Sequence, residues 1–258
     1  MNRTIPSRIV GEWRAVNRAH ESVGSIHDDA TARRLGFRGG FVGGVTIMSY
    51  VCESWRREQG FPLALAPFRM TVDLRAPVYQ DETARVHAAQ AGTAWHYAVE
   101  TDPGQVTSDG VIEATDRPLW PASPSQDGAP ALDGVALGDL PMRERVFPRE
   151  EVRRYYEETL VGAITEDGAL PVSIGLWANP MMSVLERINP TQISAHRSSE
   201  MFVAALPLSD RPYRFVDVVE RIEARGESKA LVHVRCEVFD SEDQRIALIL
   251  HRSAVRRR

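Results

Sequence analysis

Apolar residues near the start of the chain recur at helical spacing in two places. Ile9, Trp13 and Val16 mark a short first helix, and one face of a longer helix is formed by Val45, Met48, Cys52 and Trp55. Strand-like runs bounded by turn residues follow at 68–78, 84–91, 94–101 and 106–114. The pattern predicts a unit in which an apolar helix packs against the face of a sheet.

The second half of the chain repeats this order. A helical pattern begins with Val152, Tyr155, Tyr156 and Leu160, and a mostly apolar segment covers residues 174–188. Strand-like runs then follow at 201–205, 215–224, 230–239 and 245–254. Because both halves share one order of elements, we expect an internal repeat with a period near half the chain.

A segment rich in proline and glycine separates the halves. Residues 117–139 contain four prolines and three glycines among alanine, serine and aspartate, a composition typical of a linker. The expected organisation is a first domain at 1–116, a linker at 117–139 and a second domain at 140–258. The predicted fold class is α+β with antiparallel sheets.

Composition excludes several functions. The 258-residue chain carries a formal charge of −4, which disfavours a nucleic-acid partner, and no apolar run approaches the length of about 20 residues that spans a membrane. The first residues lack the apolar core of a secretory signal, so the expected compartment is the cytoplasm. The seven histidines show no paired metal-ligand spacing, and no phosphate-binding or dinucleotide-binding glycine motif is present. Neither a metal nor a cofactor is expected.

Candidate chemistry is concentrated in residues 22–44. His27 follows a polar turn, a short amphipathic stretch follows at 30–35, and glycine pairs precede the longer apolar helix. The N-terminus of a helix presents unpaired N–H groups and a partial positive charge, which suits a developing enolate oxygen. The start of this helix is therefore a favourable place to polarise a carbonyl group.

The order of these residues resembles the active-site stretch of the MaoC-like (R)-specific enoyl-CoA hydratase/dehydratase family. In that family the motif runs Asp, any residue, Asn, Pro, an aliphatic residue and His, then a helix, then His-Gly at the head of the central helix. Here Ile26 and His27 match the aliphatic-His pair, and Gly44 matches the glycine. Residues 75–81 resemble the family's strand that ends in Pro-Val and a Gly-Asp turn.

The chain departs from the family's motif at four positions. The aspartate place holds Ser22, the asparagine place holds Gly24, the proline place holds Ser25, and the histidine before the glycine is replaced by Gly43. The corresponding part of the second half, at 165–168, contains no histidine. The resemblance therefore implies a second half that shapes the acyl or CoA channel without a catalytic motif.

The resemblance also implies a fold and an activity. The implied fold is a tandem (double) hotdog, in which each antiparallel sheet wraps around a central helix, the helices starting near Gly44 and near Ile174. The implied activity is that of a lyase, a hydratase or dehydratase of enoyl or 3-hydroxyacyl thioesters carried on CoA or on an acyl carrier protein. His27 would act as acid/base and the Gly44 N–H as oxyanion donor.

The missing aspartate needs a replacement in this scheme. Ser22 is one candidate, and the carboxylates of Glu21, Asp28 or Asp29 are others. The helix at 30–35 also needs an N-cap, and this role fits Asp28 or Asp29 better. Gly43 and Asp28 are the candidate substrate-binding residues.

Two further functions stay open. The first is another hotdog enzyme, such as a thioesterase, isomerase or cyclase, that uses His27 for proton transfer without a dyad. The second is a non-catalytic protein that binds a ligand or a partner. A carboxylate within hydrogen-bond reach of His27 favours the hydratase, whereas an isolated His27 favours another enzyme. Isolated hotdog domains of the family pair side by side, and a tandem chain would supply this pair internally. A homodimer of the whole chain is a separate possibility.

Overall fold

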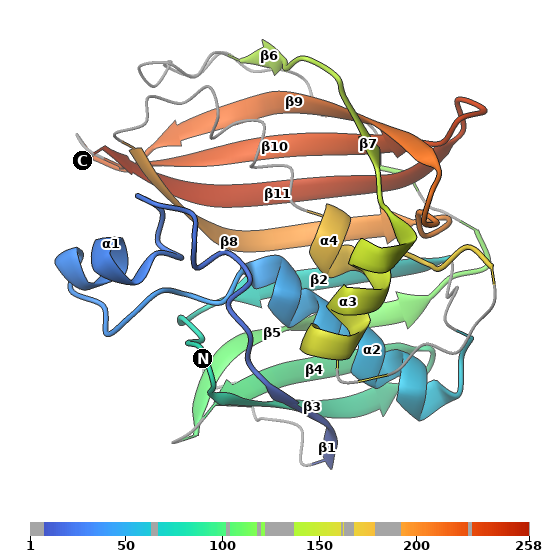
Figure 1. Cartoon of the computed structure of the whole chain (residues 1–258), viewed down its shortest axis with the longest axis horizontal. Helices are drawn as coiled ribbons and strands as arrows, with labels where there is room; N and C mark the ends of the chain where they lie inside the picture. The colour runs from blue at the N-terminus through green and yellow to red at the C-terminus, as the bar shows by residue number, and fades with distance from the viewer. Residues whose placement is uncertain are drawn as a thin grey trace.

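The computed structural model describes residues 8–62, 67–101, 104–117, 120–121, 137–160, 162, 168–178, 192–226 and 229–257. Its described strands form one antiparallel sheet of eleven strands (Figure 1). In the first half these are β1 (Arg8–Arg14), β2 (Phe68–Leu74), β3 (Thr83–Ala91), β4 (Ala94–Thr101) and β5 (Gln105–Ala114). In the second half they are β6 (Gly138–Asp139), β7 (Arg143–Val146), β8 (Gln192–Val203), β9 (Pro212–Ala224), β10 (Lys229–Phe239) and β11 (Arg245–Arg257).

The two halves of the sheet have the same strand order. Neighbouring strands run β1-β3-β4-β5-β2-β8-β11-β10-β9-β6, and β7 also pairs with β9. Outward from the junction of β2 and β8, the order β2-β5-β4-β3 corresponds to β8-β11-β10-β9. The junction itself is a ladder from the pair Phe68 and Val203 to the pair Asp73 and Ser198. One continuous sheet therefore contains the strands of both halves.

Four helices occur in the described residues: α1 (Asp29–Arg34), α2 (Gly44–Gln59), α3 (Arg149–Thr159) and α4 (Ile174–Trp177). In Figure 1, α2, α3 and α4 lie together in front of the middle of the sheet, and α2 contacts both α4 and β1. Both α2 and α4 begin where the sequence predicts, but residues 179–188 of the second predicted helix lie outside the described residues. Most of the predicted linker lies outside them as well. None of the described helices has the length and apolar character needed to cross a membrane.

The helix predicted around Ile9, Trp13 and Val16 is wrong, because this segment forms strand β1 at the edge of the sheet. Burial follows a period of two, with Trp13 and Ala15 buried and the residues on either side of Trp13 exposed. Pairing with β3 fixes this conformation. Ile9, which completed the helical pattern, is 51% exposed and contributes little to the core.

Strand limits also differ from those expected. The run predicted at 68–78 ends at Leu74, because the backbone then turns and Val78 accepts a hydrogen bond from the Val42 N–H. The run predicted at 201–205 belongs to a longer strand, β8, whose first nine residues are mostly polar. Their pairing with β11 makes them a strand despite that composition.

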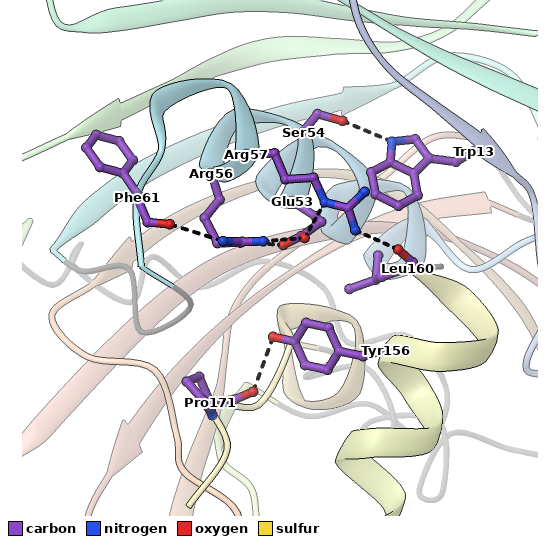
Figure 2. Close-up of polar contacts among 9 residues, drawn as sticks. All are labelled: Trp13, Glu53, Ser54, Arg56, Arg57, Phe61, Tyr156, Leu160 and Pro171. Carbon is purple, nitrogen blue, oxygen red and sulfur yellow. Dashed lines mark hydrogen bonds and ion pairs between the residues drawn. The ribbon is translucent and has the colours of Figure 1, made fainter. Parts of the chain in front are cut away.

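Helix α2 is buried along most of its length, so its polar side chains require internal partners. Glu53 is 6% exposed, and its carboxylate accepts hydrogen bonds from Arg56 at 2.7 Å and from Nε of Arg57 at 2.7 Å (Figure 2). Arg57 also donates to the Leu160 carbonyl at the end of α3, at 2.9 Å. This network ties α2 to α3 and satisfies a charge that would otherwise be buried alone.

Strand β1 is attached to the same helix. The indole N–H of Trp13 donates to Ser54 Oγ at 2.9 Å, and the Arg57 guanidinium lies 4.9 Å from the centre of the Trp13 ring. A further contact joins the buried Ser49 hydroxyl to that of Tyr155 of α3, at 2.9 Å. These contacts fix the position of α2, and with it the position of its first residue, Gly44.

The Glu53 network gives a stability prediction. Glu53→Gln should lower the free energy of unfolding by about 2–3 kcal/mol, because the hydrogen bonds from Arg56 and Arg57 to a buried carboxylate are replaced by bonds to an uncharged amide. Urea denaturation followed by circular dichroism measures the change. The control is Arg14→Gln, which breaks an exposed ion pair with Asp81 and should cost less than about 1 kcal/mol. Equal losses in the two variants would contradict a stabilising role for the network.

Candidate functional site

The backbone around His27 is held by residues before it and after it in the chain. Its carbonyl accepts a hydrogen bond from the Asn17 side-chain amide at 2.8 Å, and its N–H donates to Ser25 Oγ at 3.1 Å. Any side chain on Gly40 would collide with this carbonyl, so only glycine fits there. The preceding residue, Ile26, is buried and accepts from the Phe41 N–H at 3.0 Å. The half-buried imidazole is thus presented from a fixed loop.

The Phe41 carbonyl determines which nitrogen of the neutral His27 ring carries the proton. His27 Nδ1 lies 2.7 Å from this carbonyl oxygen. Because a carbonyl only accepts hydrogen bonds, Nδ1 carries the proton, and Nε2 of the neutral ring bears the lone pair. Burial lowers the pKa of His27 below its ordinary value of 6.5, and the hydrogen bond to Phe41 opposes this to a smaller extent. His27 is therefore a neutral base near pH 7.

The ring of His27 lies beside the start of α2. Gly43 is the N-cap of this helix and provides no side chain to cap it. A methyl group placed on Gly43 would lie 4.0 Å from Cε1 of His27. Within the described residues the N–H of Gly44 has no hydrogen-bond acceptor, as is usual for the first turn of a helix. The structure thus brings together His27, Gly43 and Gly44.

The candidate carboxylates Asp28 and Asp29 make their hydrogen bonds to groups other than the His27 ring. Asp28 is the N-cap of α1: it accepts from the Thr31 hydroxyl at 2.7 Å and from the N–H groups of Ala30 and Thr31, each at 3.2 Å. These contacts, the Thr31 hydroxyl above all, lower the pKa of Asp28. Asp29 accepts from the Gly40 N–H at 2.8 Å and pairs with Arg33.

Ser22 and Glu21 are both exposed, and neither side chain is hydrogen-bonded to His27. Among the described residues, no carboxylate contacts the imidazole. The Phe41 carbonyl is thus the group that orients the ring. The sequence holds no signal for it, because a backbone carbonyl can belong to any residue type.

A second histidine, from the other half of the chain, also contacts the start of α2. His196 of β8 packs against Gly44 so closely that a methyl group on Gly44 would lie 2.5 Å from His196 Nδ1. The same methyl group would collide with the Leu74 side chain at the end of β2. No local sequence pattern indicates this contact, since it depends on the pairing of β2 with β8.

Three solved structures resemble this chain over nearly its whole length. One is a conserved hypothetical protein from Mycobacterium tuberculosis with a double hotdog fold, at TM-score 0.63 and 12% identity, covering 92% of this chain and 90% of that chain. This chain has a double hotdog fold. A protein assigned as a MaoC domain dehydratase from Chloroflexus aurantiacus gives TM-score 0.57 at 11% identity, covering 100% and 99%. A MaoC-like dehydratase gives TM-score 0.54 at 12% identity, covering 98% and 99%.

The likeness to MaoC-like proteins that the sequence predicts is thereby confirmed at the level of the fold. No protein-family model matches the chain, and no curated protein matches its sequence.

Gly43 and Gly44 give a paired prediction. Gly44→Ala should destabilise the protein by about 1–3 kcal/mol, because the added methyl overlaps the ring of His196 and the side chain of Leu74. Gly43→Ala should leave stability nearly unchanged, since φ is −60° and the nearest atoms lie 3.8 and 4.0 Å from the added methyl. Thermal unfolding of the two variants measures the difference. A Gly44→Ala protein as stable as Gly43→Ala would contradict the close approach of His196.

Proposed function

We propose that this protein is a hydratase or dehydratase acting on an acyl thioester, enoyl or 3-hydroxyacyl, carried on CoA or on an acyl carrier protein. One observation carries the proposal: His27, with its Nε2 lone pair, lies beside the uncapped N-terminus of α2. A base next to a carbonyl-polarising helix end is what removal of a proton α to a thioester requires.

In the proposed dehydration, the thioester oxygen accepts a hydrogen bond from the Gly44 N–H. The partial positive charge of the helix end stabilises the enolate that forms when His27 Nε2 takes the α-proton. The C3–O bond then breaks as the C2–C3 double bond forms. The proton on His27 passes to the departing hydroxyl, which leaves as water. Hydration is the reverse of these steps, and His27 ends each cycle neutral.

The fold supports this proposal. Two of the similar structures are named as dehydratases of MaoC type. We also propose that the chain is built as two hotdog units, at 1–116 and 140–258, each half-sheet wrapped on its own helix. The matching strand order on the two sides of β2 and β8 favours this arrangement.

A second candidate reaction is isomerisation of an enoyl thioester. It moves one proton between Cα and Cγ without adding water, so a single base is enough. The lack of a carboxylate partner for His27 in the described part of the chain favours it. Hydration and isomerisation both involve proton transfer at Cα, but only hydration adds a hydroxyl group at C3.

The role of His27 can be tested by mutation. His27→Ala should lower the turnover of an active enoyl-CoA substrate by about 10²–10⁴-fold, the usual loss for an acid/base residue. Ser22→Ala is the matched control and should cost much less, because the Ser22 side chain is exposed and makes no hydrogen bond to His27. The assay follows the enoyl-thioester absorbance, and mass spectrometry of the products in D₂O separates hydration from isomerisation. Turnover that survives His27→Ala unchanged would refute the assignment.

The pH dependence follows from the environment of His27. The ring must be neutral to take a proton, and burial lowers its pKa below 6.5. The value of kcat/KM should therefore be constant down to that ordinary value and decline only at lower pH, as the ring becomes protonated. Initial rates between about pH 5 and about pH 9 measure the profile. An acid limb centred above 6.5 would instead indicate a negatively charged partner at the ring.

A further inference from the structure

His196 is placed by an irregularity in the sheet. In the pairing of β8 with β11, His196 is opposite Ser253 and Ser198 is opposite Arg252, so Arg197 is an extra residue without a partner in this ladder. Such a bulge shifts the alternation of side chains by one. His196 and Ser199, three residues apart, consequently share one face of the strand. The bulge lies where β2 ends beside β8, next to the start of α2 (Figure 1).

The His196 ring begins a chain of hydrogen bonds that continues into β11. Its Nε2 lies 2.8 Å from Ser199 Oγ, and Ser199 Oγ lies 3.0 Å from His251 Nδ1. His251 Nε2 lies 2.9 Å from Ser253 Oγ. The rings of His196 and His251 are stacked with centroids 4.0 Å apart. We name these four residues the histidine–serine chain. It fixes the His196 ring with its Nδ1 edge toward Gly44.

The histidine–serine chain is uncharged at neutral pH. Burial lowers the pKa of His196 to about 4, and burial together with the neighbouring His196 lowers the pKa of His251 well below its ordinary value. Because serine hydroxyls donate and accept, the chain has two neutral proton arrangements. In one, Nδ1 of His196 carries a proton toward Gly44. In the other, Nδ1 presents a lone pair. His196 can therefore donate to an oxygen atom or accept from it without becoming charged.

We propose that His196, contributed by the second half, binds the oxygen that is added at or lost from C3 of the acyl thioester. His27 lies beside Gly43 and His196 packs against the next residue, Gly44, so they approach one helix end from the two halves of the chain. His27 moves the proton, and His196 orients the water or the 3-hydroxyl group by a hydrogen bond. The step has the same proton balance as in the proposed reaction, because His196 returns to its starting state. This proposal rests on the proposed function and extends it to the second half.

Two assays on purified full-length protein separate this role from a structural one. The first is hydration of a short enoyl-CoA. The second is exchange of the α-protons of the saturated acyl-CoA of equal length with D₂O, which needs His27 and Gly44 but involves no oxygen at C3. His196→Gln should lower kcat for hydration by about 10–100-fold, between the effect of losing an ordinary hydrogen bond and that of losing an oxyanion donor. It should leave α-proton exchange within about twofold of the wild-type rate, because His27 and the start of α2 are untouched.

The matched control is His233→Gln. His233 lies on β10, with its Nε2 3.1 Å from Oε1 of Glu223, and it is half-buried like His196. His233→Gln should leave the rates in both assays unchanged. If His196→Gln does not fold, Ser199→Ala takes its place. It removes the hydroxyl bonded to His196 Nε2 and should slow hydration by about 3–10-fold while sparing exchange, the loss expected for one hydrogen bond.

Each result decides between the proposals. Hydration that is unaffected by His196→Gln, or hydration and exchange that fall together, overturns the role of His196 and leaves the proposed function standing. A wild-type protein that catalyses neither reaction, or exchange alone, overturns the proposed hydratase and the role of His196 with it. Selective loss of hydration supports both.

Discussion

The backbone ladder between β2 and β8 is the interaction on which the rest of this structure depends. It joins two half-sheets of equal strand order into one continuous sheet. It also brings Leu74, at the end of β2, and His196, on β8, to the first turn of α2. An unpaired strand edge exposes a row of backbone donors and acceptors. The ladder therefore satisfies the backbone hydrogen-bonding groups at the edges of both half-sheets. It also determines which residues of the second half contact the first half.

Burial of α2 imposes the second constraint. A helix enclosed on several sides cannot direct its charged residues to solvent, so Glu53 is neutralised by Arg56 and Arg57, which follow it on the same helix. Arg57 extends this network to the end of α3. The side chains that neutralise the buried charge of the helix thus also fix its position relative to α3. Because the helix is fixed, its N-terminus at the candidate site is fixed as well.

The sequence predicts much of this fold because the relevant signals are local. The start of α2 follows from the glycines at 43 and 44 and the apolar spacing after them, and β9, β10 and β11 follow from strand-like runs bounded by turn residues. The prediction is wrong for β1, because Ile9 fits a helical period only by coincidence. Pairing with β3 makes this segment a strand. The prediction fails also in the first part of β8, whose polar residues are typical of a loop.

The same division holds for the candidate site. His27 and Gly44 are recognisable because both lie in one segment whose spacing resembles the MaoC-like motif. The Phe41 carbonyl leaves no trace in residue type, and the contact of His196 with Gly44 requires both a long-range strand pairing and a bulge at Arg197. Asp28 illustrates the converse: a carboxylate next to the candidate histidine in sequence caps α1 instead. Closeness in sequence is a poor guide to which groups meet in a site.

The Phe41 carbonyl differs in kind from the aspartate that the MaoC-like motif places with its histidine. A peptide carbonyl has a dipole but no net charge, and it neither titrates nor attracts a cloud of counterions. The orientation and tautomer of the His27 ring are therefore independent of ionic strength for as long as the loop is folded. The protonated ring, on the other hand, gains no opposite charge to stabilise it. His27 is thus a weaker base than one paired with a carboxylate, and in the described part of the chain its ring has no ion pair for salt to screen.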